Sequence, residues 1–131
     1  MLRRELCMLP DDEEYLNNAF PDWESLSTGN WVLLPNFPLP DGYEQKSAIV
    51  AIKIPSGYPT TAPDMAYFYP PIKRIDGRSI PATQCYQSID SKEFQRWSRH
   101  YRPGTWHAEE DGIAIHVMAI KDWLEKAASK E

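Results

Sequence analysis

Long apolar runs are absent from the sequence, and no stretch approaches the roughly 18 consecutive apolar residues that a membrane-spanning helix needs. Cysteine is scarce too, since Cys7 and Cys85 are the two cysteines among 131 residues and lie far apart. Small secreted domains held by disulfides carry more cysteines than this. We therefore expect no membrane association, two reduced thiols and a cytoplasmic location.

A positive charge excess is also lacking. The formal net charge is −5, with 14 basic against 19 acidic side chains, whereas nucleic-acid-binding domains are usually basic. We therefore expect no nucleic-acid partner. A local exception surrounds Trp97, where Lys92, Arg96, Arg99 and Arg102 form a basic group. Such a group suits either an acidic partner or an ordinary solvated surface.

The residues that are present fit one globular domain over 1–131, because 42% of them are hydrophobic and 25% are charged. The 12 prolines cluster within 35–40, 55–63 and 70–81, where we expect them to shape loops. No internal repeat, low-complexity segment or domain linker is found.

Two helices are predicted, one toward each end of the chain. Pro10 followed by four acidic residues is typical of a helix start, because acidic side chains favour the positive end of the helix dipole. Pro21 ends this first helix. The second is predicted over 109–126 from an apolar stripe at helical spacing. The stripe consists of Ile113, Val117, Ile120 and Leu124.

Three β-strands are predicted between the helices. Residues 30–34 form a short β-type run closed by Pro35, residues 47–54 alternate in polarity, and residues 65–69 form another short run. No helical segment separates the three runs. They are therefore expected to form an antiparallel meander with one face packed on helices, which makes the predicted fold class α+β.

The segment that follows, residues 70–93, shows no sustained period. Connections of this length are usually functional or mobile. We predict a long polar loop that contains Cys85, followed by a helical turn over 94–100.

Cys85 is the candidate nucleophile, because its neighbours in the sequence are polar. An accessible loop cysteine can act as a thiolate nucleophile or carry an acyl group as a thioester. The alternative is a half-buried cysteine without a chemical role. Cys7 lies among Leu6, Met8 and Leu9 and is interpreted as a packing residue.

Three histidines follow Cys85. They are His100, His107 and His116, and one of them could pair with the thiol as in a Cys–His hydrolase, although no acid or amide orienting motif accompanies them. A zinc site of Cys85, His100 and His107 would lack paired ligand spacing, so we expect neither a metal ion nor another cofactor. His116 borders the apolar stripe and is interpreted as a hydrogen-bonded residue at the edge of the core.

Trp97 and Trp106 flank a segment that contains Arg99 and Arg102. Large amphipathic rings in a polar segment can anchor a partner, so these four residues are the candidate partner-binding group. The same rings can instead cover the core, and this is the interpretation favoured for Trp97.

The order of several segments along the chain is a further indication of its fold and family. They are Leu9-Pro10 through Tyr15-Leu16, Pro35 to Tyr43, Pro55 to Pro59 with Ala62 to Met65, Phe94 to His100, and Asp111-Gly112-Ile113. Their order over about residues 9–125 resembles the ubiquitin-conjugating enzyme superfamily. Within that superfamily the chain is similar to the bacterial group called prokaryotic family E.

The resemblance implies a UBC-like α+β fold. Its parts are a four-stranded antiparallel β-meander, flanking N-terminal and C-terminal helices, and a long active-site loop. It also implies two partners, a ubiquitin-like modifier and an activating-enzyme homologue. The activating enzyme would pass the modifier to Cys85 as a thioester, and this chain would pass it on to an amine.

One feature of the superfamily is missing. Its members generally carry a His-Pro-Asn motif shortly before the nucleophile, and the Asn helps to stabilise the oxyanion. This sequence has no Asn after Asn36. Gln84, backbone amides or His100 could substitute for it, and His100 is the leading candidate, because a histidine can stabilise an oxyanion or relay a proton near neutral pH. Two alternatives stay open: an inactive module that binds the modifier or its activating enzyme, and a Cys–His isopeptidase.

Overall fold

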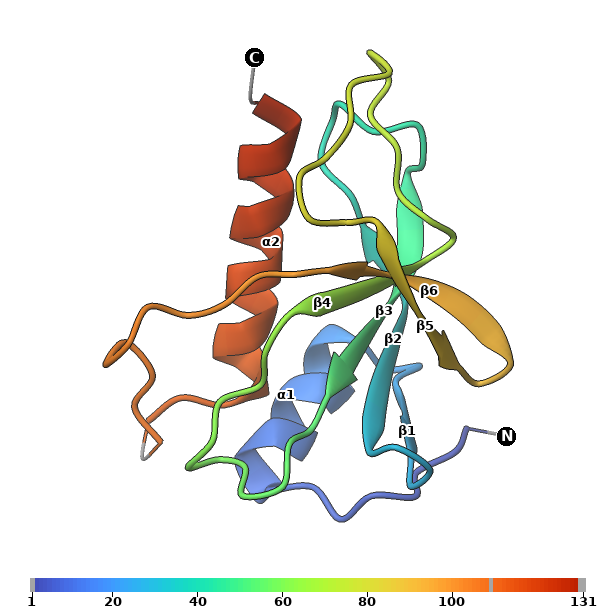
Figure 1. Cartoon of the computed structure of the whole chain (residues 1–131). Helices are drawn as coiled ribbons and strands as arrows, with labels where there is room; N and C mark the ends of the chain where they lie inside the picture. The colour runs from blue at the N-terminus through green and yellow to red at the C-terminus, as the bar shows by residue number, and fades with distance from the viewer. Residues whose placement is uncertain (1, 109, 130–131) are drawn as a thin grey trace.

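A computed structural model of the chain describes residues 2–108 and 110–129. Within that part, two helices lie on one side of a curled antiparallel sheet of six strands, as Figure 1 shows. The strand order across the sheet is β1-β2-β3-β4-β6-β5. The elements are α1 (Pro10–Ala19), β1 (Glu24–Leu26), β2 (Trp31–Pro38), β3 (Ser47–Lys53), β4 (Ala66–Tyr69), β5 (Cys85–Ile89), β6 (Lys92–Trp97) and α2 (Ile113–Ser129).

Both predicted helices are confirmed, with a shift in the second. Helix α1 begins at Pro10 and has acidic residues in its first turn, as the helix dipole favours. Helix α2 begins at Ile113 rather than at residue 109, and it continues to Ser129. A residue that is distant in the sequence holds the start of α2, because the N–H of Ile113 donates to a carboxylate oxygen of Asp12 in α1.

The three predicted strands are confirmed as β2, β3 and β4, but β2 does not end at Pro35. It continues to Pro38, and its register against β3 shifts between Leu34 and Phe37. Asn36 within this shift has a φ of 57°. Proline is tolerated where a bulge interrupts the ladder of hydrogen bonds, so Pro35 lies within the strand instead of closing it.

The prediction of a helical turn over 94–100 is wrong, because β6 (Lys92–Trp97) forms a hairpin with β5. Asp90 and Ser91 join the two strands with φ values of 51° and 64°, the backbone of a tight two-residue turn. Alternation then sends Phe94 to one face of the sheet and Trp97 to the other. The irregular part of the predicted loop is therefore 70–84.

Cys85 is accordingly not a loop residue. It is the first residue of β5, and β5 is the last strand of the sheet. The prediction failed because Asp-Ser is not a strong hairpin signal, and because most of β5 is polar and exposed. The hairpin projects away from both helices in Figure 1.

Apolar side chains cover both faces of the sheet. The main core lies between the sheet and the helices, where Phe68 and Trp97 meet the stripe of α2. A second cluster lies on the opposite face. It consists of Leu26, Trp31, Leu33, Ala51, Tyr67, Ile89 and Phe94. The sheet curls over this cluster, so its two ends approach each other on the face away from the helices.

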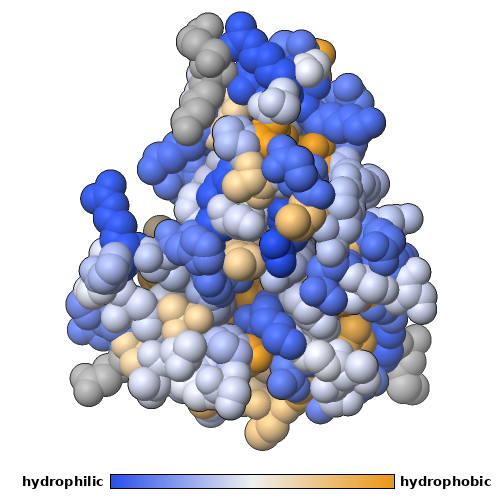
Figure 2. All heavy atoms as spheres, viewed as in Figure 1, coloured by the Kyte–Doolittle hydropathy of each residue, from blue (hydrophilic) through white to orange (hydrophobic). Residues whose placement is uncertain are grey.

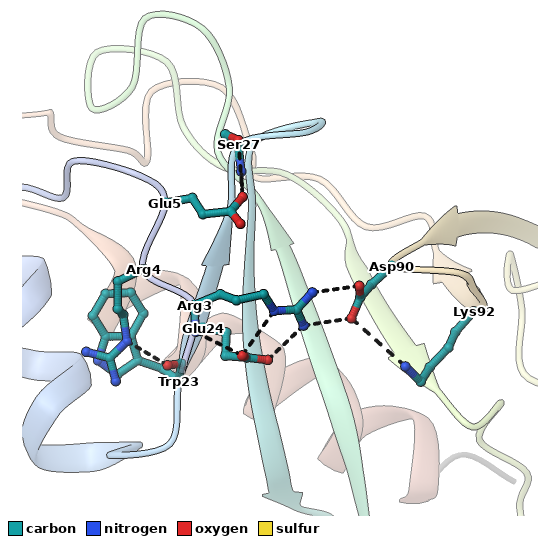
Figure 3. Close-up of polar contacts among 8 residues, drawn as sticks. All are labelled: Arg3, Arg4, Glu5, Trp23, Glu24, Ser27, Asp90 and Lys92. Carbon is teal, nitrogen blue, oxygen red and sulfur yellow. Dashed lines mark hydrogen bonds and ion pairs between the residues drawn. The ribbon is translucent and has the colours of Figure 1, made fainter. Parts of the chain in front are cut away.

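The N-terminal segment ties these two ends together. Arg4 forms a parallel bridge with Ser25 of β1, and the side chain of Arg3 reaches across to the hairpin turn (Figure 3). The Arg3 guanidinium donates to both carboxylate oxygens of Glu24 and to both of Asp90, at 2.8–3.1 Å. Hydrogen bonds from Arg3 lower the pKa of each of these carboxyl groups.

We expect Arg3→Ala to lower the free energy of unfolding by about 1 kcal/mol at low salt, because exposed ion pairs contribute little even as bidentate networks. The loss should shrink toward zero near 1 M NaCl, where charges are screened. Urea unfolding at both salt concentrations measures it, with Lys121→Ala on the exposed side of α2 as the control. A salt-independent loss would contradict the electrostatic account.

Figure 2 shows a mostly hydrophilic surface on the side seen in Figure 1, with apolar residues in small separate patches. Large hydrophobic side chains that are exposed lie on different parts of the described chain. They are Leu2, Leu9, Ile75, Tyr86 and Met118. Of these, Tyr86 lies directly beside Cys85.

Candidate functional site

Cys85 has a free, exposed thiol at the start of the edge strand β5. The strand register sets it opposite Arg96 of β6, and Arg96 in turn lies opposite Tyr67 of β4. Residues opposite one another in an antiparallel sheet project to the same face. Cys85 therefore faces away from the helices, in one row with Arg96 and Tyr67.

Arg96 is the cation of this row. Its side chain is half-buried, and its Nε atom is buried without a hydrogen-bond partner among the described residues. Buried donors without a partner are uncommon in folded proteins. A guanidinium in this position can donate to a negatively charged oxygen beside Cys85.

His100 lies three residues after the end of β6. Its Nδ1 atom is 2.9 Å from the Asp64 carboxylate, and Asp64 belongs to the segment before β4. Among the described residues, the hydrogen-bond partner of the His100 ring is Asp64, and no hydrogen bond joins His100 to Cys85. His107 is exposed, and its backbone N–H donates to Asp111 at 2.7 Å.

The four partner-binding candidates occupy different environments. The ring of Trp97 is fully buried, and its Nε1 donates to Gln95; this is the core position that was favoured for it. The Arg99 guanidinium lies 5.0 Å from the centre of that ring, and burial lowers the pKa of Arg99. Arg102 is exposed, whereas Trp106 is half-buried and donates to the Pro59 carbonyl at 2.8 Å.

His116 is fully buried and holds the segment between β6 and α2 in place. Its Nε2 atom lies 3.0 Å from the Met65 carbonyl, and its Nδ1 atom lies 2.6 Å from the Tyr101 hydroxyl. A carbonyl oxygen can only accept, so Nε2 carries the proton and Tyr101 donates to Nδ1. Burial lowers the pKa of His116 to about 4.

Asp12 was missed as a structural residue, because its place in the first turn of α1 explains an acidic side chain without any tertiary role. It is buried, and it accepts from Tyr58 Oη at 2.6 Å and from the Ile113 N–H at 3.0 Å. Burial, and then the bond to Asp12, raise the pKa of Tyr58. Asp12 thereby joins α1, α2 and the loop after β3.

Two hollows flank β5, one on each face of the sheet. The larger, of about 630 Å³, is bordered by Gln87 and Ser88 on one side and by Arg3 on the other, with Trp31 and Tyr67 among its lining residues. The smaller, of about 440 Å³, is bordered by Tyr86 on the face toward the helices. The strand that begins with Cys85 thus separates two open spaces.

Within 2–108 and 110–129, no three His, Cys, Asp or Glu side chains are grouped in a way that could hold a metal ion. None of the helices in the described part is long and apolar enough to cross a membrane.

Comparison with known proteins agrees with the observed arrangement of helices and sheet. The model of the family described as Prokaryotic E2 family E matches residues 8–127, and the α+β arrangement of curled antiparallel sheet and two helices is compatible with an E2-like fold. No curated protein and no solved structure matches the chain. The family match covers most of the chain and confirms the resemblance seen in its ordered segments, so the chain belongs to prokaryotic E2 family E.

Proposed function

We propose that this protein carries a ubiquitin-like modifier as a thioester on Cys85 and transfers it to an amine. The observation that carries the proposal is an exposed, free cysteine at the uncovered end of a sheet in a chain of the E2-like family. The Cys85 thiolate would attack the thioester between the modifier and its activating enzyme, forming a new S–C bond and releasing the enzyme's thiol. An amine would later attack the same carbonyl and release Cys85.

The surroundings of Cys85 favour a carrier over a hydrolase. A carrier needs an accessible thiol that is also a good leaving group. A Cys–His isopeptidase needs a histidine within hydrogen-bond reach of that thiol, but His100 is engaged with Asp64 and His116 with Tyr101 and Met65. In the proposal, Arg96 rather than His100 stabilises the oxyanion. A reducing compartment such as the cytoplasm suits a thiol that must stay free.

Loading with modifier, activating enzyme and ATP, resolved with and without reductant, tests the proposal. The modifier and activating enzyme used would be those of the same organism. We expect an adduct that reductant removes, that Cys7→Ser retains and that Cys85→Ala abolishes. Cys85→Ser should give a reductant-resistant ester or no adduct.

A second function is supported by the missing Asn, because the sequence has no Asn after Asn36. The chain would then be an inactive module that binds the modifier or its activating enzyme. Binding to either protein without any adduct on wild-type protein would favour this module. An adduct that survives Cys85→Ala would overturn the carrier assignment altogether.

A further inference from the structure

The outer edge of β5 is open. Within the described residues, β5 pairs with β6 on one side and with no strand on the other, and Cys85 through Ser88 are exposed. Exposed edges carry unpaired N–H and C=O groups that readily accept another extended chain. Folded proteins normally keep an edge strand short, place charged residues on it or cover it. In this protein the edge strand β5 begins at Cys85, the candidate nucleophile.

The hairpin turn tells which backbone groups face outward. In a hairpin with a two-residue turn, the flanking residues, here Ile89 and Lys92, exchange both backbone hydrogen bonds. Such pairs alternate along the ladder, so the free N–H and C=O groups belong to Tyr86 and Ser88. The Gln87 side chain donates to the Ser88 carbonyl at 3.1 Å, which agrees with an outward carbonyl.

We propose that this edge binds the C-terminal tail of the modifier as an additional antiparallel strand. The inference rests on the proposed function, because Cys85 must receive the end of that tail. Strand β5 runs from Cys85 to Ile89. A tail whose last residue lies at Cys85 must therefore run in the opposite direction, toward the start of β5, which makes the pairing antiparallel.

The two hollows provide room for such a strand. Side chains of an added strand alternate between the faces of the sheet. A tail residue opposite Gln87 would project toward the hollow with Trp31 and Tyr67, and one opposite Tyr86 would project toward the smaller hollow. The backbone supplies most of the attraction in strand addition, so tails of different sequence should bind in the same register.

Hydrogen exchange in a peptide adduct tests directly whether a tail pairs with the outer edge of β5, and it does not require the activating enzyme. The probe is the synthetic peptide Thr-Val-Thr-Val-Thr-Gly-Gly as its mercaptoethanesulfonate thioester, reacted with the Cys7→Ser protein. The Cys85 thiolate attacks the thioester carbonyl, the new S–C bond forms, and mercaptoethanesulfonate leaves and takes up the proton that Cys85 released.

We expect the amide of Ser88, and that of Tyr86, to exchange about tenfold more slowly in the adduct, since each gains a hydrogen bond. The Gln87 amide already faces β6 and is the internal control. An adduct made with glycine mercaptoethanesulfonate thioester, which is too short to pair, should leave all three amides unchanged. Unchanged Tyr86 and Ser88 amides in the long adduct would overturn the proposal.

Ser88→Pro provides the matched functional test. Proline removes the outward N–H of residue 88 and is tolerated on the solvent side of an edge strand, whereas Ser88→Ala keeps that N–H. We expect Ser88→Pro to lower the rate of modifier loading about fivefold to tenfold and Ser88→Ala to leave it unchanged. Equal alkylation of Cys85 by iodoacetamide in both variants would show that the strand and its thiol are intact.

The outcomes separate the two proposals. If the amides are protected in the peptide adduct but the activating enzyme loads no modifier onto the protein, the carrier function is overturned and the edge is a peptide-binding strand. Normal loading of Ser88→Pro, with iodoacetamide reactivity preserved and no amide protection, would overturn the added strand and leave the carrier function standing.

Discussion

Asp12→Ala is expected to lower the free energy of unfolding by roughly 3–4 kcal/mol. The substitution leaves the Ile113 N–H and the Tyr58 hydroxyl without the carboxylate that both contact. Each buried donor that loses its partner costs about 1–3 kcal/mol. The backbone around Gly112 fits closely against this carboxylate, since a Cβ atom there would lie 2.5 Å from Asp12 Oδ1.

Asp11→Ala is the matched control, because Asp11 lies in the same first turn of α1 but is exposed. Both substitutions remove one acidic group from the positive end of the α1 dipole, which is worth less than about 1 kcal/mol. Urea unfolding of both variants, analysed with a common m-value, measures the difference. Equal losses would mean that Asp12 acts through the dipole of its own helix and not by joining α1 to α2.

The second large effect is a loss of stability in acid that depends on His116. The pKa of its imidazole is about 4 in the folded protein, chiefly because of burial, against an ordinary value of 6.5. At a pH between these two pKa values, the His116 imidazole is therefore protonated in the unfolded chain but neutral in the folded chain. This contribution to stability is fully present above pH 6.5 and is lost as the pH falls toward 4, by up to about 3 kcal/mol.

His116→Gln isolates this contribution. A glutamine can donate to the Met65 carbonyl and accept from Tyr101 but does not titrate. We expect the free energy of unfolding of wild type to fall between pH 7 and pH 4.5 by about 2 kcal/mol more than that of the variant. His107→Gln, which removes an exposed histidine outside this contact, is the matched control. Parallel pH profiles for wild type and His116→Gln would contradict the assignment.

The sequence alone determined the elements that depend on local pattern. Acidic residues after Pro10, the apolar stripe from Ile113 to Leu124, and the alternating run over 47–54 each satisfy one regular geometry within a few turns or residues. These elements, with the order of the proline-rich segments, were sufficient to predict an α+β fold and the family. The role of Cys85 as a nucleophile came from the same source and stays a prediction.

The tertiary structure decided which groups meet. Cys85 lies opposite Arg96 because a tight turn at Asp90 and Ser91 sets the register of β5 and β6. Register over a polar strand is weakly specified by its own residues, and here the buried side chains of Ile89 and Phe94 pin it against the second core cluster.

Contacts between residues that are distant in the sequence could not be predicted from local patterns either. Arg3 reaches Asp90, and Asp12 reaches Ile113, across separations of 87 and 101 residues. Each side chain alone has an ordinary local interpretation as a charged residue near an element end. Only the packing of helices on the sheet and the curl of the sheet bring these charges to their partners. Local patterns therefore determined both helices and strands β2, β3 and β4, whereas pairing and packing over longer range determined the β5–β6 hairpin and the site.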